Sequence, residues 1–116
     1  MSTYVYITRR TSPLDDDGPS ISAREWLDYV ARQTDFRVPQ GSEREWVGEH
    51  AMVWTGYEYP IVFDLSAGQI EAKNAYGSIV VRMKAIAAEL AATVYDENGV
   101  VYDEAGEDAG FLPGFP

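Results

Sequence analysis

The sequence contains one histidine, His50, so its surroundings are the first place to look for catalysis or metal binding. With Glu49 beside it, His50 could act as a general base, because imidazole changes its charge near neutral pH. One histidine and no cysteine would leave a metal site to be built mostly from carboxylates. We therefore expect no metal and no cofactor, and His50 stays a candidate only for the pocket of a small enzyme or ligand-binding domain.

Paired carboxylates are the second possible chemistry, as in glycosidases, where two acids flank the scissile bond. The candidates occupy the middle of the chain: Glu43, Glu45, Glu49, Glu58 and Asp64. Their separations depend on the fold, and among nineteen acidic residues some pair is expected to approach by chance. The run from Asp15 to Asp17 lacks the alternate spacing and distant glutamate of a calcium-binding loop. We therefore predict no catalytic residue.

Aromatic and acidic residues gather between positions 46 and 59, and this composition favours protein binding over catalysis. Tyrosine and tryptophan supply large contact areas with few rotatable bonds, so protein interfaces are enriched in them. The candidate partner-binding residues are Trp46, Trp54, Tyr57, Glu58 and Tyr59. The alternative is that both tryptophans belong to the core and the tyrosines only decorate a turn.

The charge balance points to a basic partner. Nine basic and nineteen acidic residues give a formal net charge of −10, which repels nucleic acids and acidic membranes and attracts basic proteins. No uninterrupted apolar run reaches the length of about 18 residues that a membrane span needs. The first charges follow a short apolar run instead of preceding it, unlike a signal peptide. Together with the absence of cysteine, this predicts a cytoplasmic protein.

The chain length of 116 residues predicts one domain, over residues 1–104. Residues 105–116 form an acidic, glycine-rich tail that ends in Phe-Leu-Pro-Gly-Phe-Pro. The two phenylalanines and the leucine suggest docking onto the domain or a partner, and the alternative is a frayed end.

The first helix is expected to begin at Ala23. Ser22 at the N-cap and Glu25 three residues later form a capping box, and Ile21 before the cap forms a hydrophobic staple with Trp26. The helix should continue to about residue 33 and bury one stripe of side chains: Trp26, Leu27, Val30 and Ala31.

A second helix is expected over residues 76–91, after Asn74, whose side chain can cap its first turn. Apolar residues three and four positions apart form its buried face: Ile79, Met83, Ile86, Ala87 and Leu90. The dipeptide Asn98-Gly99 separates two strand-like segments, residues 93–97 and 100–104. It predicts a hairpin with a type I′ turn.

Alternating apolar residues predict further strands at residues 3–9, 50–55, 61–65 and 69–73, whereas residues 34–45 indicate a surface connection. Short turns favour antiparallel pairing, and one apolar face per helix places both helices on one side of the sheet. We expect an α+β fold, a two-layer sandwich with a mostly antiparallel sheet of about four to six strands. The order β-α-β-β-β-α-β-β is compatible with a ferredoxin-like variant.

One set of residues, considered together, extends over most of the chain: Tyr4-Val5-Tyr6, Arg9-Arg10, Ile21, Glu25-Trp26, Gly68-Gln69-Ile70, Ala72-Lys73-Asn74, Met83, Ala85-Ile86-Ala87, Leu90, Ala92 and residues 96–102. In these residues the chain resembles a group of small, acidic, mostly uncharacterised bacterial proteins. The chain departs from the group at Ala75, where the group tends to have proline. The resemblance implies an immunity-type or accessory protein of bacterial toxin or secretion loci, and it brings no catalytic residues.

Three hypotheses follow for the function. The first, which we favour, is a non-catalytic module that binds a basic protein partner, such as a toxin that an immunity protein neutralises. The second is a small ligand-binding domain or small enzyme with a pocket near His50. The third is a structural homodimer joined through a sheet edge or through the tail.

Overall fold

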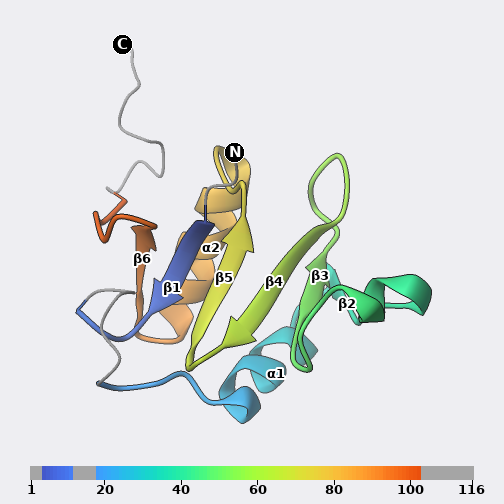
Figure 1. The fold of residues 1–116 in the computed structure, drawn as a ribbon, viewed down its shortest axis with the longest axis horizontal. Coiled ribbons are helices and arrows are strands. Elements are labelled where there is room, and N and C mark those ends of the chain that lie inside the picture. Colours follow the sequence, from blue (N-terminus) through green and yellow to red (C-terminus); the bar gives the residue numbers. More distant parts are fainter. Residues whose placement is uncertain (1–3, 12–17, 103–116) are drawn as a thin grey trace.

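The structure is a computed structural model that describes residues 4–11 and 18–102, and these residues form the α+β fold expected from the sequence (Figure 1). The elements follow in the order β1 (Tyr4–Thr8), α1 (Ala23–Ala31), β2 (Phe36–Arg37), a 3-10 helix (Gly41–Glu45), β3 (Met52–Trp54), β4 (Ile61–Ser66), β5 (Gln69–Lys73), α2 (Ser78–Glu89) and β6 (Thr93–Asp96). Within the described residues the strands form one six-stranded sheet in the order β2-β3-β4-β5-β1-β6. Every neighbouring pair is antiparallel.

The first strand of the chain lies inside the sheet, between two strands from its second half. Because β1 is antiparallel to both β5 and β6, those two strands run in the same direction, and α2 makes the crossover between them. This arrangement is a split βαβ unit. Figure 1 shows α2 behind β1, β5 and β6, and α1 behind the other half of the sheet.

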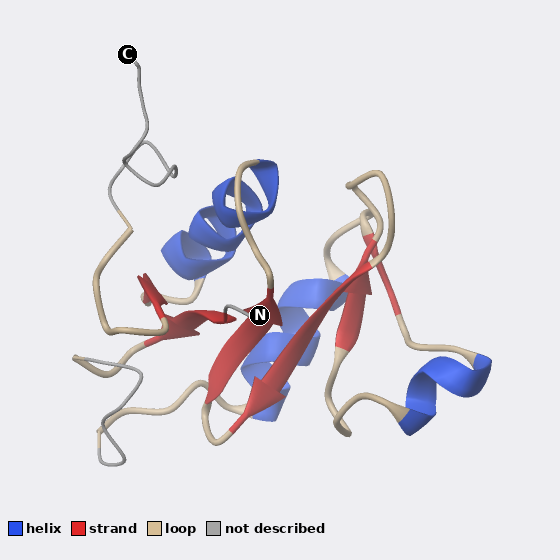
Figure 2. Cartoon of the chain, turned by 45° about the horizontal axis from the view of Figure 1, so that its top comes forward, coloured by secondary structure: helices blue, strands red, loops and turns tan. Residues whose placement is uncertain are grey.

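One face of the sheet carries the core. Val5 and Ile7 of β1 lie opposite Ala72 and Ile70 of β5, and all four side chains are buried. They belong to the same apolar cluster as the buried residues of both helices. The helices therefore cover one face together, as expected, and Figure 2 shows the two layers from a tilted direction.

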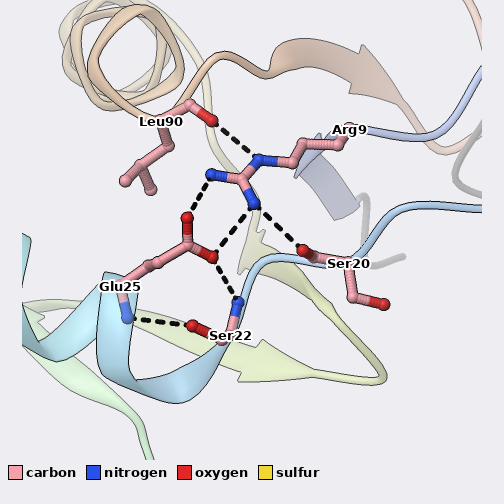
Figure 3. A network of polar contacts seen from close by, with 5 residues as sticks. All are labelled: Arg9, Ser20, Ser22, Glu25 and Leu90. Carbon is pink, nitrogen blue, oxygen red and sulfur yellow. Dashed lines mark hydrogen bonds and ion pairs between the residues drawn. The ribbon is translucent and has the colours of Figure 1, made fainter.

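The start of α1 follows the prediction from its capping residues. The hydroxyl oxygen of Ser22 accepts a hydrogen bond from the Glu25 backbone N–H at 3.1 Å, and Glu25 Oε1 accepts one from the Ser22 N–H at 3.0 Å. Arg9, at the end of β1, forms a two-bond fork with the Glu25 carboxylate, with distances of 3.0 and 2.7 Å (Figure 3). The Arg9 Nε donates to the backbone carbonyl of Leu90. One guanidinium thus connects the end of β1 with the start of α1 and the end of α2.

The buried stripe of α1 differs in part from the expected one. Trp26 is fully buried, Leu27 and Val30 are half-buried against the core, and Ala31 is exposed, whereas Tyr29, which was not expected, is buried. The buried Tyr29 hydroxyl accepts a hydrogen bond from Arg82 Nη1 at 2.6 Å, which satisfies its polar group inside the fold. In α2 the whole expected apolar face is buried.

The type I′ hairpin lies at a different place from the one predicted. Ala67 and Gly68, between β4 and β5, have φ values of 55° and 82°, the two positive angles that this turn requires. At the expected site only Gly99 has positive φ. There the Asp96 carboxylate accepts from the N–H groups of Asn98 and Val100, and the Gly99 N–H donates to the Asp96 carbonyl. This is an aspartate-initiated turn followed by a left-handed glycine.

The capping role expected for Asn74 is also wrong. Asn74 has φ of 57° and ends β5, while α2 begins at Ser78 after Gly77, whose φ is 55° and ψ −127°. A backbone in that conformation favours glycine, so Gly77 redirects the chain into the helix. The N-cap position of α2 is thus Gly77, which has no side chain to cap the helix.

Sequence patterns also misjudged some shorter elements. The supposed connection over residues 34–45 contains β2 and the 3-10 helix, and the strand expected at 50–55 is only Met52–Trp54. Val101 forms an isolated bridge to Tyr95, while residues 103–104 of the expected last strand, the tail 105–116 and the run Asp15–Asp17 lie outside the described residues. Among the helices that the structure describes, none combines the length and apolar character of a membrane span.

Candidate functional site

Trp54 lies inside the fold and supports the loop that carries the candidate tyrosines. Its side chain is 5% exposed, and its indole N–H donates to Asp35 Oδ2 at 2.8 Å. Gly56 lies directly on the indole ring, since a Cβ at that position would approach the ring atoms to 2.8 Å. Trp54 therefore cannot offer its own surface to a partner, but it fixes the backbone of the β3–β4 loop.

Two loops bring three tyrosines together at one end of the sheet. Both loops, β3–β4 and β5–α2, lie at the top of Figure 1. Tyr57 and Tyr59 come from the β3–β4 loop, and Tyr76 comes from the segment between β5 and α2. The Tyr57 ring lies 5.1 Å from the Tyr59 ring and 6.4 Å from the Tyr76 ring, nearly perpendicular to both. It stacks on Trp54 at 6.3 Å. We call Tyr57, Tyr59, Tyr76 and the neighbouring Glu58 the tyrosine cluster.

The hydroxyl groups of the tyrosine cluster converge on Tyr76. The oxygens of Tyr57 and Tyr76 lie 3.5 Å apart, a long hydrogen bond. Donation to Tyr76 is the main cause that raises the pKa of Tyr57 to about 12, and a hydrogen bond to Tyr76 also raises the pKa of Tyr59. Accepting from Tyr57 and Tyr59 lowers the pKa of Tyr76. The Glu58 carboxylate is close enough to disfavour the ionised form of all three phenols.

The cluster is exposed at the surface and anchored by hydrogen bonds at its base. Tyr59 and Tyr76 are 52% and 56% exposed, whereas Tyr57 is half-buried. Below them, Asp35 accepts hydrogen bonds from both Trp54 and Arg82, and the hydrogen bond from Arg82 is the main cause that lowers the pKa of Asp35. Exposed aromatic rings on an anchored base lose little entropy on binding, which suits an interface.

Trp46 does not join this cluster. It follows the 3-10 helix, which lies beyond β2 and away from the β3–β4 loop in both Figures 1 and 2. Its side chain is 81% exposed, the most exposed of the large apolar residues that the structure describes. Of the five candidate residues, the structure thus brings together Tyr57, Glu58 and Tyr59, with Trp54 beneath them and Trp46 elsewhere.

The backbone of His50 takes part in the packing of α1 against the segment before β3. Its backbone carbonyl accepts the indole N–H of Trp26 at 2.8 Å, and its side chain is half-buried. A surface hollow of about 310 Å³ lies nearby and has Glu49, Arg44 and Val47 in its lining, but not His50. Within the described part of the chain, no group of three or more histidine or acidic residues could hold a metal ion.

Among the carboxylate candidates, Glu43 pairs with an arginine and Asp64 faces another carboxylate. Glu43 forms a fork with Arg37 at 2.8 and 2.9 Å, and this ion pair lowers the pKa of Glu43 to about 2. Asp64 lies directly opposite Glu71 on the face of the sheet away from the helices. Burial, and then the charge of Asp64, raise the pKa of Glu71. Asp64 Oδ2 accepts from the Gly48 N–H at 3.0 Å, so this side chain has a structural role.

The candidate residues found from sequence did not include Tyr76. It stands 19 positions after Tyr57, beyond two strands, and no local pattern links the two. Only the pairing of β4 with β5, which returns the chain to the same end of the sheet, brings them together.

The fold and the cluster define a small antiparallel α+β protein with a tyrosine-rich surface at one end, which includes Glu58. Comparison of the chain with protein-family models, with curated proteins and with solved structures finds no match in any of the three.

Proposed function

We propose that this protein is a non-catalytic binding module for a basic protein partner, and that the tyrosine cluster is its docking surface. The observation that carries this proposal is the convergence of Tyr57, Tyr59 and Tyr76 from two loops, with the rings of Tyr59 and Tyr76 more than half exposed. Tyrosines are frequent among the few residues that supply most of the binding free energy of an interface.

The net charge of −10 supports the same partner chemistry. An acidic protein steers a basic one toward it and raises the association rate, while aromatic contacts slow dissociation. The expected complex is therefore sensitive to salt in its formation and to tyrosine substitution in its lifetime.

The resemblance to small acidic bacterial proteins makes a toxin the partner that we favour. On this proposal the protein is immunity-type and neutralises the toxin by covering its basic surface. The absence of cysteine is compatible with the reducing cytoplasm, where we propose that the protein acts.

The test is a pull-down from the source cell with the purified protein, washed at low and at high salt. We expect one stoichiometric basic protein that is lost as salt rises. Tyr59→Ala should weaken its binding by roughly 5-fold to 30-fold, the range for an aromatic anchor. The matched control is Trp46→Ala, which removes another exposed aromatic residue that lies next to the 3-10 helix and away from the cluster.

Two results would contradict the proposal. A partner lost with Trp46→Ala but kept with Tyr59→Ala would place docking at the 3-10 helix instead. Absence of any bound basic protein at either salt concentration would remove the proposed function and return weight to a small ligand or to self-association.

A further inference from the structure

We propose that the tyrosine cluster receives a single arginine side chain of the partner, with its guanidinium against the exposed rings of Tyr59 and Tyr76 and paired with Glu58. This inference deepens the proposed function and rests on it, since the arginine belongs to the basic partner. Its argument comes from the way this fold binds an arginine of its own.

The interior holds a complete arginine site around Arg82. The guanidinium lies 5.6 Å from the centre of the Tyr29 ring and 5.2 Å from that of Phe36. Its Nε and Nη2 donate to the two oxygens of Asp35 at 2.9 and 3.1 Å, and Nη1 donates to the Tyr29 hydroxyl at 2.6 Å. Nη2 also donates to Gln33 Oε1 at 3.2 Å. Two aromatic rings, one carboxylate, one phenol oxygen and one amide oxygen thus surround the cation.

The tyrosine cluster has the aromatic, carboxylate and phenol components of this site on the surface. It offers tyrosine rings, the Glu58 carboxylate and phenol oxygens close together. Within residues 4–11 and 18–102, the ion pairs and cation–aromatic contacts use other residues and leave Glu58 and the three tyrosines uncompensated by a basic side chain. Charge complementarity therefore identifies a cation as the occupant.

Arginine fits this surface better than lysine for a geometric reason. A guanidinium is planar and weakly hydrated, so it can stack on a ring while its in-plane N–H groups reach a carboxylate and a phenol oxygen. An ammonium group is strongly hydrated and has no plane to stack. The cluster should therefore discriminate between the two cations, which simple attraction by net charge would not do.

The test uses the full chain and three blocked tripeptides, glycine–X–glycine, in which X is arginine, lysine or citrulline. Citrulline has nearly the shape of arginine without its charge. Binding is followed by NMR from the ring signals of Tyr59 and Tyr76, with those of the buried Tyr29 as an internal reference. We expect saturable shifts with arginine, about threefold to fivefold weaker binding of lysine, and none with citrulline.

Substitutions then locate the site. Glu58→Gln keeps the shape of the side chain but removes its charge, and it should weaken arginine binding about threefold or more. Glu45→Gln makes the same change on the exposed 3-10 helix and should leave binding unchanged. Equal binding of lysine and arginine, binding of citrulline, or equal effects of the two substitutions would overturn the inference.

The peptide test and the pull-down can fail separately. A basic protein that is captured through Tyr59, without preference of the cluster for arginine, would keep the proposed function and refute the arginine site. Selective arginine binding without any captured protein would support the site and refute the proposed partner.

Discussion

The carboxylate of Asp35 and the guanidinium of Arg82 meet in a two-bond fork, although 47 positions separate them in the chain. Asp35 precedes β2 and Arg82 lies on α2, so the pair joins the edge of the sheet to the helix layer. Because Asp35 also accepts the indole N–H of Trp54, the same carboxylate fixes the residue on which Tyr57 stacks. The Asp35 carboxylate thus contributes both to the stability of the fold and to the support of the tyrosine cluster.

Asp35→Asn should therefore destabilise the protein by about 1–3 kcal/mol, because it leaves the mostly buried Arg82 without its counter-ion. The free energy of unfolding in urea measures this loss. Arg24→Gln is the control, since the Arg24–Asp28 pair is exposed and 3.6 Å long and should contribute at most about 1 kcal/mol. Similar values for both variants would show that burial gives the Asp35–Arg82 pair no special weight.

Glu25 should make the stability of the protein fall in acid. Hydrogen bonds from Arg9, and then from Ser22, lower the pKa of Glu25 from 4.5 to about 2. A carboxyl group with a lowered folded-state pKa stabilises the fold above its unfolded value, and this contribution is lost as the pH falls from about 4.5 to about 2. Urea midpoints between these pH values should fall less steeply for Glu25→Gln. Parallel curves for the two proteins would contradict the assignment.

The pKa of Glu71 is shifted in the opposite direction from that of Glu25, so its charge should destabilise the fold. Burial and the opposing Asp64 raise its pKa, so the ionised form costs stability in the folded state at neutral pH. Glu71→Gln should raise the free energy of unfolding at pH 7 by up to about 1 kcal/mol, the range for like charges on facing residues of neighbouring strands. The gain should vanish below the unfolded pKa of glutamate. A gain that persists in acid would point to packing instead of charge.

The β4–β5 turn contains a residue that is poorly suited to its conformation. Ala67 has φ of 55°, where asparagine is better tolerated, so Ala67→Asn should stabilise the protein by about 0.5–1 kcal/mol. Thermal unfolding measures the gain. Gly68→Ala is the opposite case, since a Cβ there would meet Ser20 Oγ at 2.5 Å, and it should destabilise the hairpin. If both variants lower the melting temperature, the turn is not of type I′.

The hydroxyl of Tyr76 should control the ionisation of Tyr57. Donation to Tyr76 is the largest cause of the raised pKa of Tyr57, about 12, and Tyr76→Phe removes the acceptor while it keeps the ring. The pKa of Tyr57 should then fall toward the ordinary value of about 10. Ring NMR signals followed from pH 8 to 12.5 on the stable wild type and the variant measure it. An unchanged pKa of Tyr57 would mean that burial, and not this hydrogen bond, sets its value.

Local patterns were enough to predict much of the fold. The cap of α1, the buried faces of β1 and α2 and the strands β4 and β5 depend on residues a few positions apart. Side-chain periodicity and capping chemistry act over that same range, so they can be read directly from the chain. The antiparallel two-layer architecture then followed from short turns and from one apolar face on each helix.

Competition among local contacts explains the turns that were misplaced. Asn98-Gly99 has the composition of a type I′ turn, but Asp96 accepts two backbone N–H groups there and stabilises a different turn. Ala67-Gly68 has a weaker signal, yet the pairing of Ser66 with Gln69 imposes the type I′ geometry on it. Strand register determines the turn between β4 and β5, whereas the Asp96 side chain determines the turn at Asn98-Gly99.

The sequence by itself determined the α+β class, the places of both helices along the chain, the acidic charge and the presence of aromatic residues near position 57. Tertiary structure alone decided that Trp54 lies in the core, that Trp46 stands apart, and that Tyr76 completes the cluster. The physical reason is distance along the chain. Periodicity reports which face of one element is buried, whereas the meeting of two loops depends on strand pairing and on long-range contacts such as that of Asp35 with Arg82.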